Sequence, residues 1–302
     1  MRLIADIGGT NARLALSESG QVIDGSTRQY VNANWDSLYA LIADFLSHLA
    51  RPSISEVVVA VAGPVHAERA ELTNFHWSVE AAQLAALIGA PHVRLLNDLT
   101  ALGHAASELR DDQLKLIRSG NPKQSAVSQS LVVGMGTGFN VSPVLRSAAH
   151  VICPAVEAGH IAMPFSISAQ LNPLALAPEN FPTIESLFSG GGLTNFVHHM
   201  TGQPDLTGPA IIAAYGDPKV AVVVDQYAGL LGILLQELSL AYMPSAGIYL
   251  AGSVARSLMS VAAAPCMQAF ERNASSLLHP DTPIWSINDD LAALTGCAKF
   301  EM

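Results

Sequence analysis

Two segments of this chain share one pattern: an apolar strand, a glycine-rich turn and a second apolar strand. The first covers residues 3–16 and turns at Gly8 and Gly9, and the second covers residues 131–145 and turns at Gly136 and Gly138. The similarity predicts an internal duplication, with one hairpin in each half of the chain. Because glycine has no Cβ, backbone N–H groups in such a turn can close on a bulky anion. A plain hairpin turn is the structural alternative.

A carboxylate stands just before the first turn. Asp6 follows the apolar run Leu3–Ala5 and precedes Ile7-Gly8-Gly9-Thr10-Asn11. Such a carboxylate can hold a cation against a bound anion, directly or through a water molecule. The first hairpin therefore predicts a phosphate and Mg²⁺ site.

The remaining segments of the first half alternate between strand and helix patterns. We expect further strands at 22–23, 28–31, 56–62, 66–73 and 93–98. We expect helices at 35–50, capped by Asn34, at 78–88, capped by Ser78, and at 99–106. This order predicts a mixed sheet with helices on its faces.

The second half opens with a polar stretch over 110–129, which we interpret as part of a loop. Residues 150–180 also have the composition of a loop. Helices are predicted from Thr183 to the glycines at 190–192, at 193–200, at 218–241, after Ser253 to about Phe270, and at 290–300. Strands are predicted at 247–253 and 283–287.

Composition excludes several classes of protein. The 302 residues are enough for two domains, and 50% of them are hydrophobic. The net charge of −10 argues against nucleic acid as a partner, because phosphate backbones are bound by dense Lys and Arg. The three scattered cysteines indicate neither a zinc site nor a disulfide framework, and they fit a reducing cytoplasm.

The sequence predicts neither a signal peptide nor a membrane span. No basic and apolar leader opens the chain, so no signal peptide is expected. The most hydrophobic stretch, Val220–Met243, is interrupted by polar residues and predicts a buried helix in place of a membrane span.

Six blocks, taken in order, resemble the bacterial hexokinase-type glucokinase family, within the actin/hexokinase/Hsp70 ATPase fold. They are residues 6–13, 72–77, 97–98, 134–138, 157–160 and 248–254, and they span almost the whole chain. The resemblance implies a two-domain α/β fold of the actin-like ATPase type, a duplicated ribonuclease H-like fold with an inter-domain cleft. It implies a small domain over 1–108, completed by the C-terminal helix 289–302, and a large domain over 109–288.

The resemblance also implies the residues that contact ATP. Asp6 would organise Mg²⁺, both hairpins would contact phosphate, and the end of strand 247–253 would lie near the adenosine. The implied nucleotide residues are Asp6, Gly8, Gly9, Thr10, Asn11, Gly136, Thr137, Gly138, Gly252 and Ser253. For Gly252, close packing of strand on helix is the alternative.

Asp98 is the candidate general base. A sugar hydroxyl is a poor nucleophile near neutral pH, and a carboxylate within reach can accept its proton during phosphoryl transfer. The carboxyl end of a strand is a suitable place for such a group. Capping of the helix that starts at Leu99 is the alternative role, and the two roles are compatible.

A sugar site needs many paired donors and acceptors. Residues at the family's sugar-binding positions are Asn97, Asp98, Glu157, His160 and Glu185. Without the resemblance, His160 would be a structural histidine and Glu185 a solvated helix residue. Asn74 is a further candidate, with an ordinary turn residue as the alternative.

Two positions depart from the family pattern. Ala158 stands where the family often has the first glycine of Glu-Gly-Gly-His, so we expect φ below zero there. Asn140 stands where many relatives have glycine, and asparagine tolerates a left-handed turn.

The resemblance implies ATP-dependent phosphorylation of the glucose 6-hydroxyl by a cytoplasmic homodimer. A kinase for another hexose, such as mannose or fructose, is one alternative. The repressor/ORF/kinase group often carries a zinc-binding cysteine cluster, which this chain lacks. A sugar-binding regulator without catalysis is the other alternative.

Overall fold

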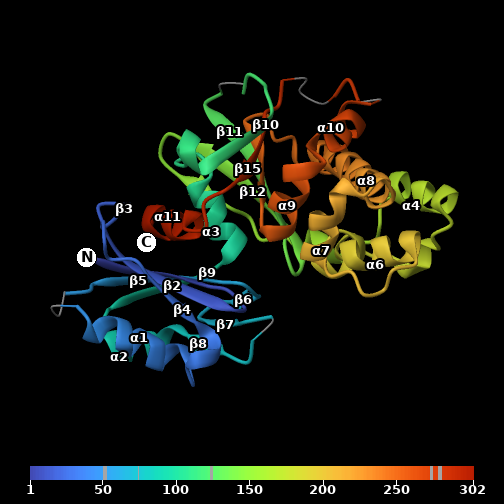
Figure 1. Ribbon diagram of the computed structural model, residues 1–302. Coiled ribbons are helices and arrows are strands. Elements are labelled where there is room, and N and C mark those ends of the chain that lie inside the picture. The colour runs from blue at the N-terminus through green and yellow to red at the C-terminus, as the bar shows by residue number, and fades with distance from the viewer. Residues whose placement is uncertain (50–52, 74, 123–124, 273–274, 278–280) are drawn as a thin grey trace. The chain divides into compact units, whose positions relative to one another are not determined.

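The structure is a computed structural model that describes residues 1–49, 53–73, 75–122, 125–272, 275–277 and 281–302. The described chain has a mixed α/β fold with two compact units. Unit 1 comprises Met1–Arg110 and Asp289–Met302, and unit 2 comprises Asp111–Asn288. Figure 1 shows the elements of both units along the chain.

Unit 1 is built on a sheet with the strand order β3-β2-β1-β5-β9, in which β4 also pairs with β2. The strands are β1 (Arg2–Ile7), β2 (Asn11–Glu18), β3 (Gln21–Val22), β4 (Arg28–Val31), β5 (Glu56–Val61) and β9 (His92–Asn97). β1 and β2 form the predicted antiparallel hairpin, β5 is parallel to β1, and β9 is parallel to β5. The carboxyl ends of β1, β5 and β9 therefore lie at one edge of the sheet.

Helices cover both faces of this sheet. They are α1 (Leu38–Ser47), α2 (Ala81–Ile88), α3 (Asp98–Ala105) and α11 (Ala292–Lys299). Leu3 and Ala5 of β1 belong to the core cluster that includes α1 and α2, whereas Ile4 belongs to the cluster that includes α3 and α11. Because successive strand residues point to opposite faces, the two clusters lie on opposite sides of the sheet. Figure 1 shows the same arrangement, with the red α11 beside α3.

Unit 2 repeats this topology around the second hairpin. Its sheet has the order β10-β15-β14-β11-β12-β13. The strands are β10 (Leu114–Arg118), β11 (Val127–Met135), β12 (Phe139–Ser147), β13 (Val151–Ile152), β14 (Gly247–Ala251) and β15 (Ile284–Ile287). β11 and β12 form an antiparallel hairpin, β14 is parallel to β11, and β15 is parallel to β14. The predicted duplication is thus confirmed at the level of strand order and direction.

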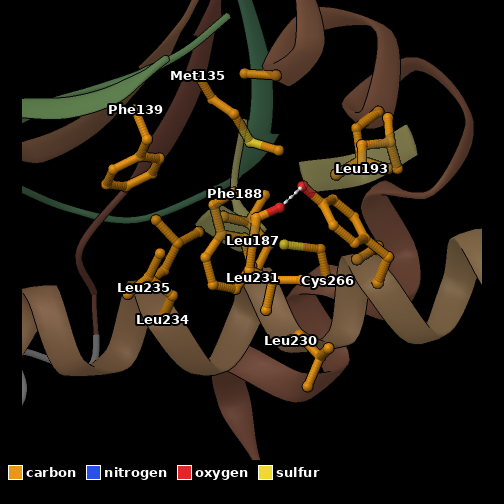
Figure 2. Close-up of a cluster of buried hydrophobic side chains, with 14 of the residues drawn as sticks. Met135, Phe139, Leu187, Phe188, Leu193, Leu230, Leu231, Leu234, Leu235 and Cys266 are labelled. Carbon is orange, nitrogen blue, oxygen red and sulfur yellow. Dashed lines mark hydrogen bonds between the residues drawn. The ribbon is translucent and has the colours of Figure 1, made fainter. Parts of the chain in front are cut away.

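A large helical core covers the sheet of unit 2. The helices are α4 (Phe165–Leu171), α5 (Ile184–Leu187), α6 (Gly190–Thr201), α7 (Gly208–Ala213), α8 (Pro218–Tyr242), α9 (Ser253–Val261) and α10 (Ala263–Glu271). Figure 2 shows Leu230, Leu231 and Leu234 of α8 in one buried cluster with Phe188 and with Phe139 of β12. The predicted buried helix is therefore α8.

Helix α8 is also long and apolar enough to cross a membrane by length and composition. However, 56% of its most apolar window is buried inside the protein. The core helix of a globular unit passes the same test of length and composition, so this finding is weak evidence for a membrane span.

Two predicted helix starts in unit 1 are wrong. Asn34 belongs to a short 3-10 turn, Asn32–Asn34, and Ser37 caps α1 by accepting a hydrogen bond from the Ala40 N–H at 3.1 Å. Ser78 does not cap α2. It starts the short strand β8 (Ser78–Glu80), which pairs with β7 (Arg69–Glu71) beside β6 (Val65–His66). Val79 is fully buried in β8, and this burial outweighs the local capping preference.

Other predictions fail where tertiary contacts decide the element. The polar stretch after Arg110 contains β10, which pairs antiparallel with β15. The 150–180 segment contains α4, whose Ile167 and Leu171 are buried in the core of unit 2. The segment after Ser253 is two helices, because the backbone at Ala262 leaves the helical region between α9 and α10.

The glycines at 190–192 also differ from the prediction. They open α6 and do not merely end α5, because Ser189 caps the new helix by accepting a hydrogen bond from the Gly192 N–H at 3.1 Å.

Candidate active site

The site residues of unit 1 gather at the edge where three parallel strands end. Ile7 of β1 is in register with Val61 of β5, and Val61 is in register with Asn97 of β9. The glycine turn follows Ile7, and Asp98 follows Asn97. The carboxyl ends of parallel strands are a common place for ligand sites. The sheet therefore brings the first hairpin and Asp98 to one edge.

The turn of the first hairpin is held by its own backbone and by a buried asparagine. The Gly8 N–H donates to the Asn11 carbonyl at 2.9 Å. Asn32 is fully buried, and its Nδ2 donates to the Gly8 carbonyl at 2.8 Å, while its N–H donates to the Thr10 carbonyl at 2.9 Å. These bonds leave little freedom to the turn that contains Gly9. No local sequence motif marks Asn32 as a residue of this site.

Asp6 lies on β1 just before this turn, next to the charged side chain of Arg13. The hairpin register places Arg13 directly opposite Asp6, and Arg13 Nη1 lies 3.4 Å from Asp6 Oδ2. Arg13 Nη2 also lies 3.9 Å from Oδ2 of Asp290, just before α11. Desolvation raises the pKa of Asp6 to about 6, although the Arg13 charge opposes this shift. Arg13 and Asp290 are not among the site residues expected from the sequence, although the spacing within the hairpin is enough to place Arg13 opposite Asp6.

Asp98 occupies the first turn of α3. Its Oδ1 accepts a hydrogen bond from the Leu99 N–H at 2.9 Å, and Asn97 Oδ1 accepts from the same N–H at 3.0 Å. Asn97 is the N-cap residue, and its Nδ2 donates to the Gly63 carbonyl at 3.1 Å. Asn97 and the first carboxylate oxygen of Asp98 thus share the cap of α3.

The environment of Asp98 changes its acidity. Desolvation, followed by the negative charge of Asp6, raises the pKa of Asp98 to about 7, and the hydrogen bond from the Leu99 N–H opposes this shift. A carboxylate whose pKa lies near neutral pH can both accept and release a proton under ordinary conditions. This property suits a general base and is not needed for a helix cap.

The residues of unit 1 fit a magnesium ion of the kind that is shared with a nucleotide. Among the described residues, no group of three or more His, Cys, Asp or Glu side chains could hold a metal by itself. Mg²⁺ in phosphoryl-transfer sites commonly takes one or two protein carboxylates, with phosphate oxygens and water as the other ligands. Asp6, with its side chain 13% exposed and its pKa raised by desolvation, is a carboxylate that a cation would stabilise in the charged form.

The second hairpin has a shorter and open turn. Met135 pairs with Phe139, so residues 136–138 form the loop, and the Gly136 N–H donates to the Gly138 carbonyl at 2.9 Å. The Gly190 N–H at the start of α6 donates to the Gly136 carbonyl at 2.8 Å. A Cβ built on Gly136 would meet no described atom within 4 Å. The turn is therefore held by the hydrogen bond from Gly190, and the space where a Gly136 Cβ would lie is open.

The second hairpin is also anchored in the core of unit 2. The flanking side chains of Met135 and Phe139 are both buried, and Figure 2 shows them directed into the same cluster as Phe188. The Phe139 and Phe188 rings lie with centroids 6.3 Å apart. The two buried flanking side chains thus anchor both ends of the turn in the core of unit 2.

Gly252 follows β14 at the corresponding edge of unit 2. Its φ of +93° and ψ of 159° are essentially restricted to glycine, and a Cβ there would lie 2.4 Å from the Met135 carbonyl oxygen. Close packing of backbone on backbone is therefore sufficient to require glycine at this position. Gly252 and Ser253, at the start of α9, are nevertheless exposed and accessible to a ligand.

Glu157 and His160 lie on a loop that β12 holds in place. Both side chains are exposed, and between them Ala158 and Gly159 are buried in the 3-10 turn Ala158–His160. A Cβ on Gly159 would lie 2.0 Å from the Phe139 carbonyl oxygen, so this position admits only glycine. Ala158 is not among the described non-glycine residues with positive φ, and the predicted φ below zero is confirmed.

Helix α5 brings Glu185 to the same place. Thr183 caps α5, and Thr183 and Ser186 form a capping box that fixes the first turn. Glu185 Oε2 accepts a hydrogen bond from the Phe139 N–H at 2.8 Å, and Glu185 Cβ lies 3.4 Å from the Cβ position of Gly159. The structure thus brings Glu185 to the loop of Glu157 and His160, 25 or more residues earlier in the sequence, at the start of β12. Asn74, the other sugar candidate, lies outside the described residues.

Comparisons with known proteins identify the family of this chain. A sequence model of the Glucokinase family matches residues 3–302. A glucokinase from Brucella suis is 31% identical over 314 aligned positions, which cover 99% of this chain and 90% of that protein.

Solved structures show the same similarity. The crystal structure of glucokinase from an Antarctic psychrotroph has a TM-score of 0.85 and 25% identity, covering 99% of this chain and 97% of that chain. A ROK family glucokinase from Streptomyces griseus, solved with glucose and AMPPNP, shares the fold with a TM-score of 0.67 and 19% identity, covering 98% of both chains. Since the family match extends over almost the whole sequence, the chain belongs to the glucokinase family.

Proposed function

We propose that this protein transfers the γ-phosphoryl group of ATP to the 6-hydroxyl of glucose. The observation that carries the proposal is the family match over residues 3–302, which includes both glycine hairpins and Asp98. The relative from Brucella suis is a glucokinase, and the structure from Streptomyces griseus contains glucose and an ATP analogue. These matches support glucose and ATP as the two substrates of this chain.

Asp98 is the proposed general base. The sugar hydroxyl must lose its proton as it attacks phosphorus, and a carboxylate within hydrogen-bond reach can accept that proton. The pKa of about 7 supports this role, because near neutral pH much of Asp98 is deprotonated and still basic enough to accept a proton. Asn97 keeps α3 capped while the Asp98 carboxylate acts on the substrate.

The two hairpins are the proposed phosphate-binding elements. In unit 1 these are Gly8, Gly9, Thr10 and Asn11, and in unit 2 they are Gly136, Thr137 and Gly138. The open space at the Gly136 Cα supports close approach of a phosphate to the second turn. Gly252 and Ser253 would contact the adenosine. Asp6 would hold Mg²⁺, directly or through water, and the ion would offset the phosphate charge when bound.

Asn97, Asp98, Glu157, His160 and Glu185 are the proposed sugar-binding residues. Glucose presents a ring of hydroxyl groups, and a selective site must pair most of them. The clustering of Glu157, His160 and Glu185 around β12 supports a shared sugar-binding role in unit 2.

We also propose the domain organisation and the oligomeric state that the family resemblance implies. The small domain would comprise residues 1–108 with 289–302, the large domain residues 109–288, and the fold would be the actin-like ATPase fold with its substrate cleft between domains. Closure of such a cleft around sugar would keep water from the activated phosphate. The protein would act as a cytoplasmic homodimer.

A coupled assay of ADP release over a panel of hexoses tests the activity. We expect glucose to give the highest kcat/KM, with Mg²⁺ and ATP both required. A higher kcat/KM for mannose or fructose would assign the chain to another hexose, and sugar binding without ADP release would identify a regulator. Replacement of ATP by polyphosphate or ADP in the same assay tests the phosphoryl donor.

A further inference from the structure

Asn140 connects the second hairpin to the loop that carries Glu157. It lies at the start of β12, opposite Gly134, and is half-buried. Its Nδ2 donates to the Val156 carbonyl at 2.8 Å and to Glu157 Oε2 at 3.0 Å. Its Oδ1 accepts from the Ala158 N–H at 2.9 Å. One side chain thus contacts three consecutive residues of the loop.

The orientation of the Asn140 amide follows from its partners. Oδ1 faces two N–H donors, since it also accepts from the Val141 N–H at 2.8 Å, whereas Nδ2 faces two oxygen acceptors. A flipped amide would oppose donor to donor and acceptor to acceptor at every contact. Only a group with one donor arm and one acceptor arm satisfies all of these partners.

Glu157 needs such support. The side chain of Glu157 is exposed, and the loop between β13 and the 3-10 turn contains no regular element that would hold it. An exposed glutamate samples several rotamers. Binding of a ligand that needs one of these rotamers therefore costs conformational free energy. A hydrogen bond from the Asn140 amide to the carboxylate restricts those rotamers before a ligand arrives.

Ala158 restricts the same loop because it is buried in the core of unit 2. Its side chain is 1% exposed and lies in the core cluster of unit 2. An alanine also has fewer backbone conformations than the glycine that the family often has at this position. The two departures from the family pattern, at Asn140 and Ala158, therefore act on one loop and in the same direction.

We propose that Asn140 is a positioning residue that holds the Glu157 carboxylate and residues 156–158 in the sugar-binding orientation. The proposal rests on the proposed function, in which Glu157 binds the sugar. Asn140 itself takes no part in proton or phosphoryl transfer. Its effect is on the affinity for the sugar and leaves the chemical step unchanged.

The experiment compares glucose binding and turnover in Asn140→Ala and Asn140→Asp with the wild type. Glucose affinity is measured by calorimetry without ATP, and kcat and both KM values by ADP release. Gln236→Ala is the matched control, because Gln236 uses its Nε2 to bridge backbone carbonyls in unit 2, including that of Arg272 at 2.9 Å.

For Asn140→Ala we expect glucose Kd and KM to rise about 10-fold, as for loss of a hydrogen bond to a charged group. kcat and the KM for ATP should stay within about twofold. Asn140→Asp should weaken glucose binding further, because it keeps the acceptor for the Ala158 N–H but places a second negative charge beside Glu157. Gln236→Ala should lower Tm without changing glucose Kd.

Different results would overturn this inference and the proposed function. An unchanged glucose Kd in both Asn140 variants would show that Asn140 is only structural. The same conclusion would follow if kcat fell together with Tm while glucose Kd did not change. A milder effect of Asn140→Asp than of Asn140→Ala would show that it orders the backbone without directing the Glu157 carboxylate. A wild-type protein that phosphorylates no hexose would instead refute the proposed function.

Discussion

Asp98 has a neighbour of like charge in Asp6. Desolvation and then the Asp6 charge raise the pKa of Asp98 to about 7, while desolvation raises the pKa of Asp6 to about 6. Asp6 belongs to β1 and Asp98 follows β9, so the sheet brings two distant carboxyl groups close enough to interact. Like charges that share a site disfavour double ionisation, and a bound Mg²⁺ would relieve this repulsion.

Asp98→Asn should abolish most turnover and keep the fold. We expect kcat to fall about 10²–10⁴-fold, the usual contribution of a general base, with glucose Kd changed by only a few fold. Helix α3 should persist because Asn97 still caps it and the new amide keeps an oxygen for the Leu99 N–H. Steady-state kinetics and calorimetric glucose titration measure the two effects. Asp205→Asn, at an exposed carboxylate, is the control, and turnover retained in Asp98→Asn would remove Asp98 from this role.

Activity should be lost in acid through the protonation of Asp98. A general base must be deprotonated, so kcat/KM for glucose should fall tenfold per pH unit below about pH 7. Because the Asp6 charge raises the pKa of Asp98, Asp6→Asn should move the midpoint of the remaining activity to lower pH. The pH profile of kcat/KM for both proteins tests this. A midpoint near pH 4 in the wild type, or no shift in Asp6→Asn, would contradict the interaction.

Stability should decrease as pH rises from about 4 to about 7. Asp98 has a folded-state pKa above its unfolded value of 3.8, so within this window the native state binds more protons than the unfolded state. Ionisation of Asp98 at higher pH therefore destabilises the fold, and Asp6 contributes in the same direction up to about pH 6. Tm measured across this range should fall less steeply in Asp98→Asn, which should be more stable than the wild type at pH 7.5. Equal slopes in the two proteins would be evidence against the raised pKa.

Gly136→Ala should separate phosphate contact from folding. The added Cβ would meet no described atom within 4 Å, and Gly136 is not among the glycines with positive φ, so Tm should stay within about 1–2 °C. If phosphate approaches this Cα, however, the KM for ATP should rise about 10-fold. Gly216→Ala is the matched control, since Gly216 also has open space and no positive φ, and both Tm and the KM for ATP should be unchanged. An unchanged KM for ATP in Gly136→Ala would argue against the second hairpin as a phosphate site.

Tyr227→Phe should destabilise unit 2. The fully buried Tyr227 hydroxyl donates to the Leu187 carbonyl at 2.8 Å, inside the hydrophobic core of unit 2. Its removal leaves a buried carbonyl without this donor and should cost about 1–2 kcal/mol. Thermal or urea unfolding measures the change, at about 2–4 °C in Tm per kcal/mol for a unit of this size. Tyr215→Phe, which removes a half-exposed bond to Asp225, should cost less, and an equal cost would show that burial is not the cause.

Several elements could be predicted from local sequence because local sequence decides them. The two hairpins, β5 and α8 all have the expected type, since apolar periodicity and glycine or proline at their ends act within a few residues. The start of α1 and the strand β8 could not be predicted. Asn34 and Ser78 are both good capping residues, but the buried Asn32 and the pairing of β7 with β8 take precedence.

The candidate site divides in the same way. Glycine at positions 8 and 136, the strand-end position of Asp98 and the family itself could be recognised from motifs in order. Asn140 could not be assigned a role, because its partners at 156–158 lie beyond the reach of local patterns. The local pattern predicts a turn residue that tolerates φ above zero, whereas Asn140 belongs to the regular strand β12.

The amino-acid sequence alone determined the paired hairpins and membership of the glucokinase family, because these depend on which residues follow one another. Only the tertiary structure decided the acidity of Asp98 and the placement of Glu157 beside Asn140. Desolvation, the Asp6 charge and the amide contacts arise between separate segments of the chain, and folding alone brings these segments close enough to interact.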